Sequence, residues 1–171
     1  MQNFAKQLRG LALGGAILMS GPSFAALIST PVPDSLVVDR GAYEWVWASP
    51  VAADGSWGAG SAVELNWNFR LPSAAEWIAS FTGVNDLHSA FVTGAGSICA
   101  SGYFSNMFSH CDAGDITQSG GYVWGAPFAT NSQSVFAETF LVRDGGGQVP
   151  LPATLPLLGL GLLALGLARR K

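Results

Sequence analysis

Basic residues are scarce in this chain of 171 residues, and their distribution excludes one large class of partner. Both lysines and three of the six arginines lie within the first nine or the last three residues. Residues 26–148 contain only Arg40, Arg70 and Arg143 against all eleven carboxylates, three cations against eleven anions, for a net charge of −8. Such a segment cannot form the basic stripe that nucleic-acid binding requires, and anionic surfaces repel it.

Cysteine is equally scarce, with Cys99 and Cys111 as the only pair. In an exported chain two cysteines most often form a disulfide, and a loop this short stabilises the fold by about 3 kcal/mol. The alternatives are a zinc site that adds His88 and His110, and a thiol nucleophile beside His110. A nucleophile must stay reduced and needs a positioned base. We therefore predict a disulfide, with no metal and no cofactor.

The carboxylates form no recognisable catalytic or metal-binding motif. A glycosidase needs two carboxylates at a defined separation, and the acids here are scattered along the chain. Asp112 and Asp115 can contribute to a calcium site, but their spacing is not that of an EF-hand. We predict no catalytic residue and no enzyme activity. A secreted carbohydrate-active hydrolase and a calcium-dependent binding module are the alternatives.

The first 25 residues have the features of a secretory signal peptide. Lys6 and Arg9 provide the positive start, and a short apolar run, Leu11–Met19, comes after them. Small residues before the bond after Ala25 suit a signal peptidase. An uncleaved anchor is the alternative, but the run is too short to span a bilayer comfortably. Residues 1–25 are thus expected to be removed by signal peptidase.

Residues Val149–Ala168 carry no charge and end at three cations. As an ideal helix this run would cover roughly 30 Å, the thickness of a bilayer core. Three prolines interrupt its first half: Pro150, Pro152 and Pro156. Proline removes a backbone donor and clashes inside a helix. The run therefore predicts a marginal membrane helix. By the positive-inside rule its cytoplasmic stop is Arg169, Arg170 and Lys171.

The same tail resembles a known sorting signal. The sequence VPLPA, a leucine- and glycine-rich run and RRK occur in that order over residues 149–171. This resembles the VPLPA variant of the PEP-CTERM tail, which an exosortase recognises and processes in the membrane. By resemblance the sorting motif is Val149, Pro150, Leu151, Pro152 and Ala153. A plain single-pass anchor is the alternative.

Residues 26–148 are predicted to form one exported globular domain rich in strands. In YEWVWAS, Tyr43, Trp45 and Trp47 share one face. In VELNWNF, four apolar residues alternate with polar ones: Val63, Leu65, Trp67 and Phe69. Two later strands are predicted in GYVWGAP and VFAETFLVR. We expect residues 83–120, which are rich in Gly, Ser and Asn, to form long loops joined by the disulfide.

One short helix is predicted after the second strand. Ser73 and Glu76 have the spacing of a capping box. The apolar face is expected to be Trp77, Ile78 and Phe81, and Gly83 is expected to stop the helix.

The body also resembles a second, loosely defined family. NFRLPSAAEW is similar to the RLPTxxEW segment of DUF1566-type and sulfatase-modifying-factor domains, and YEWVWAS and GYVWGAP occur in the corresponding order. The resemblance implies a small C-type-lectin-like fold of the α+β class, mostly β. It gives Arg70, Pro72, Glu76 and Trp77 scaffold roles. A β-sandwich is the alternative. The cysteine or copper chemistry of the sulfatase-modifying enzymes is not matched here.

Together these features predict an exosortase-sorted protein of the cell surface or extracellular matrix, such as that of a biofilm. It would be held transiently in the inner membrane by its C-terminal helix. Exopolysaccharide is its candidate partner, because exposed aromatic side chains stack on sugars. Trp57, in a glycine-rich loop, is the candidate ligand contact. The alternative is that Trp57 closes the edge of the core.

Overall fold

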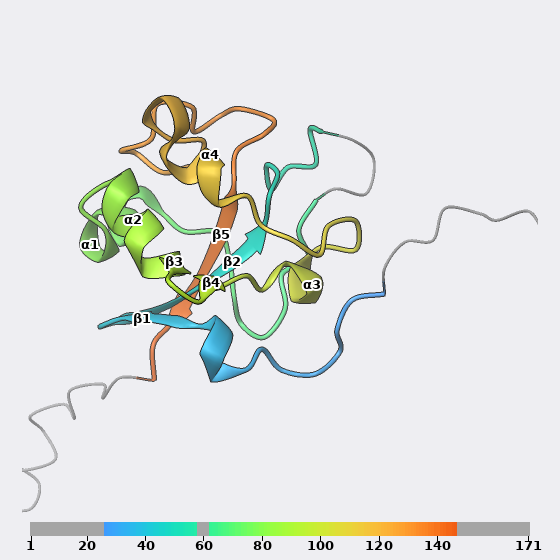
Figure 1. The fold of residues 1–171 in the computed structure, drawn as a ribbon. Coiled ribbons are helices and arrows are strands. Elements are labelled where there is room, and N and C mark those ends of the chain that lie inside the picture. The colour runs from blue at the N-terminus through green and yellow to red at the C-terminus, as the bar shows by residue number, and fades with distance from the viewer. Residues whose placement is uncertain (1–25, 58–61, 147–171) are drawn as a thin grey trace, which may run out of the picture.

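The computed structural model describes residues 26–57 and 62–146, which form an α+β fold (Figure 1). In chain order the elements are η1 (Asp34–Leu36), β1 (Val38–Arg40), β2 (Tyr43–Ser49), α1 (Ala74–Ser80), α2 (Val84–Phe91), β3 (Val92–Thr93), β4 (Gly96–Ser97), α3 (Ser101–Phe104), α4 (Ala113–Thr117), η2 (Gln118–Gly120) and β5 (Thr139–Asp144). The predicted signal peptide, residues 1–25, and the predicted sorting tail, residues 149–171, lie outside the described residues.

A three-stranded antiparallel sheet occupies the centre, in the order β1-β2-β5. The central strand, β2, confirms the strand predicted from YEWVWAS. It pairs with β5 from Tyr43 opposite Asp144 to Ser49 opposite Thr139, with one register irregularity after Trp47. The first and last parts of the body are thereby joined directly, so the sheet forms only when both are in place.

Both faces of the sheet are buried, each by a different cluster. Trp45 and Trp47 face a cluster that includes side chains from α1, α2 and α4. Val46 and Ala48 face the opposite cluster, which includes Phe104 of α3. Figure 1 shows α1 and α2 apart from α3, on opposite sides of the central strands. Successive side chains of β2 therefore point alternately into one cluster and the other, and both clusters exclude water.

The second predicted strand, VELNWNF, is wrong. Residues 63–69 form a loop that ends in a tight turn, in which the Phe69 N–H donates to the Asn66 carbonyl at 3.0 Å. Trp67 and Asn68 have positive φ, 52° and 64°, as the two central residues of a type I′ turn require. This turn buries Phe69 but leaves Leu65 54% exposed. The predicted common face is thus broken by a turn at its C-terminal end.

The capping box of α1 is confirmed, with one error in the predicted apolar face. The Glu76 N–H donates to the Ser73 hydroxyl, and the Ser73 N–H donates to the Glu76 carboxylate. Trp77 and Phe81 are buried as expected, but Ile78 is 68% exposed. The helix has only two turns, so its buried stripe runs along Trp77 and Ser80, and Ile78 lies outside it.

Residues 83–120 contain more regular structure than predicted. Gly83 does not stop α1, which ends at Ser80 with Phe81 as its C-cap. Gly83 is instead the N-cap of a second helix, α2, and α3, α4 and the β3–β4 hairpin come after it. Leu87 and Phe91 are buried on one face of α2. The Asp86 carboxylate accepts the Thr82 N–H at 2.9 Å and so secures the start of α2. The sequence analysis expected loops here because residues 83–120 are rich in polar residues. Some of these residues, such as Asp86, instead cap helices.

The two closing strands are only half right. β5 begins at Thr139, and the preceding residues form turns in which the Ala137 N–H donates to the Ser134 carbonyl. GYVWGAP contributes a single bridge, Val123 to Glu138. The described residues hold more helix than strand, so the expected predominance of β structure is wrong, although the α+β class is correct. None of the helices described is long and apolar enough to cross a bilayer.

Candidate functional site

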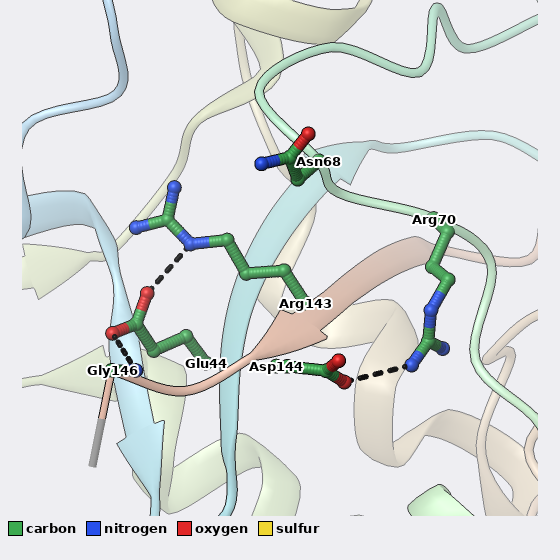
Figure 2. A pocket seen from close by; sticks show the side chains of 6 residues that line it. All are labelled: Glu44, Asn68, Arg70, Arg143, Asp144 and Gly146. Atoms are coloured by element: carbon green, nitrogen blue, oxygen red, sulfur yellow. Dashed lines mark hydrogen bonds and ion pairs between the residues drawn. The ribbon is translucent and has the colours of Figure 1, made fainter. Parts of the chain in front are cut away.

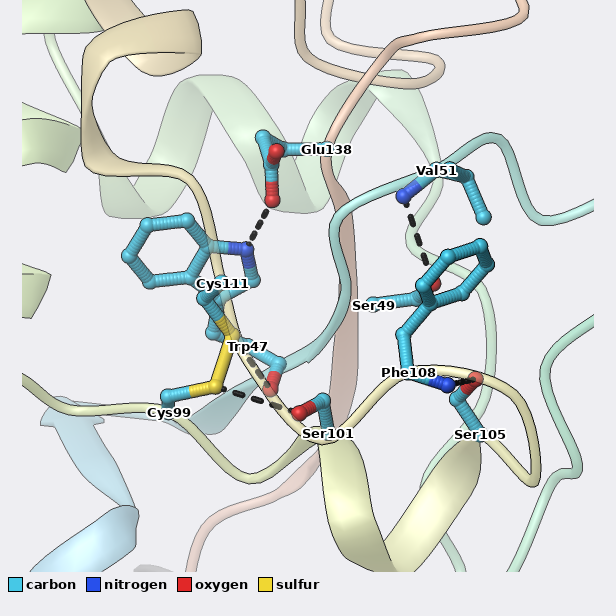
Figure 3. The surroundings of a disulfide bond; sticks show 9 residues. All are labelled: Trp47, Ser49, Val51, Cys99, Ser101, Ser105, Phe108, Cys111 and Glu138. Carbon is cyan, nitrogen blue, oxygen red and sulfur yellow. Dashed lines mark hydrogen bonds between the residues drawn. A yellow bond between two sulfur atoms is a disulfide. The ribbon is translucent and has the colours of Figure 1, made fainter. Parts of the chain in front are cut away.

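The predicted disulfide is present and holds a loop onto the core (Figure 3). Cys99 and Cys111 bond across 5.8 Å between their Cα atoms. Ile98 and Cys111 pack against the cluster that contains Trp47. The bridge therefore fixes the loop between α3 and α4, which carries Phe108, relative to the central strand.

Trp57 lies in the loop after β2 and is 47% exposed. Its ring meets Phe108 edge-on, with centroids 5.4 Å apart, and Phe108 meets His110 at 6.0 Å. The Phe108 N–H donates to the Ser105 hydroxyl at 3.1 Å, which holds the turn that presents Phe108 (Figure 3). Trp57, Phe108 and His110 together form the aromatic surface, which two distant loops build.

Glu138, which precedes β5, is a buried acid that sequence reasoning did not single out. The Trp47 Nε1 donates to its Oε2 at 2.5 Å, while Oε1 has no partner among the described residues. Burial, with smaller contributions from the nearby Asp115 and Asp112 carboxylates, raises the pKa of Glu138 to about 9 despite the hydrogen bond from Trp47. Glu138 is consequently neutral near pH 7 and has no exposed face.

Asp112 and Asp115, the candidate calcium residues, lie beside this buried acid in the α4 segment. Asp112 is the N-cap of α4 and accepts the Gly114 N–H at 3.2 Å. Burial, with a contribution from Asp112, raises the pKa of Asp115. Within residues 26–57 and 62–146, no three His, Cys, Asp or Glu side chains are grouped so that they could hold a metal ion.

A charged pocket of about 470 Å³ lies at the opposite end of the sheet (Figure 2). It is lined by residues of β2, the turn before α1, and β5 with its exit: Glu44, Asn68, Arg70, Arg143, Asp144 and Gly146. Arg143 Nε donates to Glu44 at 2.6 Å, and its guanidinium lies 4.4 Å from the centre of the Phe69 ring. Burial opposes ionisation of Glu44, but hydrogen bonds from Arg143 and Gly146 keep its pKa below the usual range.

Arg70 connects this charged pocket to α1. Its two terminal nitrogens donate to both oxygens of Glu76, at 2.9 and 2.6 Å, and one also donates to Asp144 at 3.2 Å. Hydrogen bonds from Arg70, with further ones from Ser73, lower the pKa of Glu76 to about 2 despite its burial. Two-point pairing of this kind fixes the guanidinium plane. The scaffold role expected for Arg70 and Glu76 agrees with these contacts.

The exit of the chain from β5 is held on the rim of the pocket. The Gly145 N–H donates to the Ala42 carbonyl at 2.8 Å, and the Gly146 N–H donates to Glu44 at 3.3 Å. A Cβ at Gly145 would lie 3.2 Å from the Ala42 backbone, so the chain passes close to Ala42 at this point. Gly145 and Gly146, the last residues that the structure describes, are therefore held against β2 and the residues before it.

The tail beyond this exit matches a known family. A family profile described as the PEP-CTERM protein-sorting motif matches residues 148–171. The chain carries a PEP-CTERM sorting signal. The resemblance inferred from VPLPA is thus confirmed, and the motif begins two residues beyond Gly146. Neither the curated proteins nor the solved structures contain a match to this chain.

The PEP-CTERM signal makes this an exported protein that an exosortase sorts to the surface or the exterior. Its five motif residues and the three cations of the predicted membrane stop fall outside the described residues, as does the predicted membrane helix. The DUF1566-type resemblance and the C-type-lectin-like fold have no support from the comparisons and stay predictions.

Sequence reasoning missed the partners that build the charged pocket. The alternation of β2 indicates only that Glu44 faces away from the tryptophans, and Arg143 only ends a predicted strand. Their pairing depends on the β2–β5 register, which brings residues 99 positions apart within 2.6 Å. The one signal in the sequence is the small number of cations. Residues 26–148 contain only three arginines among many carboxylates, so each arginine is a candidate for an ion pair.

Proposed function

We propose that the body is a non-enzymatic component of the cell surface or the extracellular matrix, such as that of a biofilm. It binds a neutral glycan, for example an uncharged exopolysaccharide, on the aromatic surface. Signal peptidase removes residues 1–25, and exosortase processes the PEP-CTERM tail. The C-type-lectin-like assignment of the body belongs to this proposal and adds no activity.

The observation that carries the proposal is the exposed Trp57 beside Phe108. An aromatic ring that keeps almost half of its surface in water, 47% here, leaves apolar area free for a sugar ring. Phe108 supports Trp57 from the edge, and the Cys99–Cys111 bond holds the loop that bears Phe108. Because the loop that bears Phe108 is held in place, the Phe108 ring loses little conformational entropy on binding.

Charge favours an uncharged polymer over an acidic one. All three arginines of the body pair with carboxylates: Arg40 with Asp86, Arg70 with Glu76, and Arg143 with Glu44. Asp54 lies in the same loop as Trp57, where it adds a negative charge. An acidic polysaccharide would meet this negative charge without a cation to offset it.

The alternative activities have weaker support. Glu138 has the raised pKa expected of a general acid, but it is sealed in the core and cannot reach a polymer. Asp112 caps a helix, and Asp115 is partly buried beside it. A hydrolase and a calcium-dependent module are therefore secondary proposals.

A glycan array with the exported protein tests the binding proposal. Neutral glycans should bind, and Trp57→Ala should weaken binding about five-fold, because one aromatic contact contributes on the order of 1 kcal/mol. Ile78→Ala is the matched control, since Ile78 is exposed on α1 and lies outside the aromatic surface. Turnover of any glycan, or equal affinity of the Trp57 variant, would contradict the proposal.

Mass spectrometry of the C-terminus tests the fate of the tail. We expect the mature surface protein to end in the neighbourhood of Pro150–Pro156. Deletion of the exosortase should leave the full-length form in the inner membrane, and replacing the three terminal cations with serine should impair retention and processing together. An intact C-terminal Lys171 in cells with active exosortase would show a permanent anchor.

A further inference from the structure

We propose that the charged pocket is a docking surface for exosortase, which contacts the folded body while it processes the tail. The proposal rests on the PEP-CTERM signal and adds a second determinant of recognition, in the body. Its basis is the juxtaposition of the pocket, the fixed exit of β5 and the start of the motif.

Chain length forces this proximity. Gly146 is bound to Glu44, and Val149, the first residue of VPLPA, is three residues further on. Three residues reach at most about 11 Å. An enzyme that encloses Val149 is much larger than this distance, so its surface must meet the body around the exit.

The rim of the charged pocket is the part of the body that the enzyme meets. Asp144 and Gly146 are next to the exit in the chain, and both line the pocket with Arg70. The side chains of Asp144 and Arg70 are 87% and 44% exposed, so both are available to a partner. Arg70 is oriented by its bidentate pair with Glu76.

The chemistry of this rim defines the partner surface. The most exposed group is the Asp144 carboxylate, in a body of net charge −8. We therefore infer that exosortase presents a cation to Asp144 and an acceptor oxygen to Arg70. Opposite charges at the edge of an interface mainly increase the rate of association. A bilayer surface is a different partner, and a change of charge at Asp144 separates the two.

The first experiment compares processing rates in cells that express the exosortase. Full-length protein is followed by pulse–chase, and the fraction with a processed C-terminus is measured. Asp144→Lys should slow processing at least about five-fold, because the reversed charge repels the enzyme's cation. Asp54→Lys is the matched control, because Asp54 lies in the loop beyond the far end of β2, a strand that is itself about 20 Å long, and it should retain the wild-type rate. Equal thermal midpoints of the two variants exclude misfolding.

A linker separates proximity from other effects. Eight Gly/Ser residues between Gly147 and Gln148 add about 16 Å of reach. With this linker, Asp144→Lys should be processed within two-fold of the linker variant alone, since the body no longer has to meet the enzyme. A rate unaffected by Asp144→Lys without the linker would overturn the proposal. Faster processing would also overturn it, because a lysine there would favour an anionic lipid surface.

A motif variant distinguishes failure of docking from failure of sorting. Replacing both Pro150 and Pro152 with alanine should abolish processing whatever residue stands at position 144. If that variant is still processed, the sorting function of VPLPA fails, and the docking proposal fails with it. If the motif is required but Asp144→Lys has no effect, only the docking proposal fails.

Discussion

The two ends of β5 hold carboxyl groups in opposite states. Before the strand, Glu138 is buried without a cation, and burial raises its pKa to about 9. After the strand, Arg143 pairs with Glu44 at 2.6 Å, and Arg70 pairs with Glu76 at 2.6 Å and lowers its pKa to about 2. One end is therefore neutral and closed, whereas the other is ionised and open to the charged pocket.

The difference shows how a chain with few cations distributes them. Arg70 and Arg143 line the charged pocket, and the third arginine of the body, Arg40, pairs with Asp86 near the start of α2. No ion pair within the described residues reaches Glu138, so its carboxyl can be buried only with its proton. A buried acid far from any cation is consequently stable near neutral pH as a hydrogen-bonded core group.

The largest effect is expected from removing the donor at the neutral end. Trp47→Ala should lower the free energy of unfolding by about 3–5 kcal/mol, because Trp47 is buried, stacks on Phe140 and donates to Glu138. Urea unfolding measures the loss. Trp67→Ala, at a half-buried turn residue, is the control. If it cost more, the assignment of the core to the β2–β5 pair would be wrong.

A pH series should show opposite dependences at the two ends. Because Glu138 has a raised pKa, its stabilising effect is complete below about 4.5, the ordinary pKa of a glutamate, and declines as the pH rises toward about 9. Between pH 5 and pH 8 the loss should be on the order of 4 kcal/mol. Glu138→Gln should abolish this slope in urea unfolding. If the stability of the Glu138→Gln variant still fell with pH in the same way, a group other than Glu138 would be responsible for the pH dependence.

Removal of the disulfide should be somewhat milder than loss of Trp47. Cys99→Ser should lower stability by about 3 kcal/mol, because the bridge holds the loop between α3 and α4 against the neutral end. The folded wild type should have an intact mass about two daltons below its reduced mass, as one disulfide requires. Free thiols in protein recovered from an oxidising compartment would contradict the bridge.

The smallest effects are expected at the ionised end. Glu76→Gln should cost about 1–2 kcal/mol at neutral pH, since it weakens the Arg70 pair and the capping box. The lowered pKa of Glu76 means that its stabilisation is present above about 4.5 and disappears as the pH falls toward about 2. Thermal unfolding measures this, and the difference in stability between the wild type and Glu76→Gln should be smaller at pH 3 than at pH 7. Asp144→Asn, at an 87% exposed carboxylate, should change stability by less than about 0.5 kcal/mol.

Local signals in the sequence predicted the parts of the fold that depend on few residues. Ser73 and Glu76 are three residues apart, and their mutual hydrogen bonds form within one helical turn. YEWVWAS alternates and became β2. VELNWNF alternates as clearly but became a loop, because the Asn66–Phe69 turn reverses the backbone. Alternation of apolar and polar residues alone cannot distinguish a segment that becomes a strand from one that becomes a loop, since it does not specify a strand partner.

The sequence by itself determined the sorting signal, the capping box and the cysteine pair, because each is read from residues close together in the chain. The tertiary structure decided the states of the carboxyl groups. Hydrogen bonds from Arg143 and Gly146 keep the pKa of Glu44 below the usual range, whereas Glu138 is neutral because the fold buries it without a cation. It also placed the exit from β5 on the rim of the charged pocket, since the N–H groups of Gly145 and Gly146 donate to Ala42 and Glu44 there. Desolvation and charge pairing depend on the atoms that surround a group in space, and these cannot be inferred from how far apart residues are in the sequence.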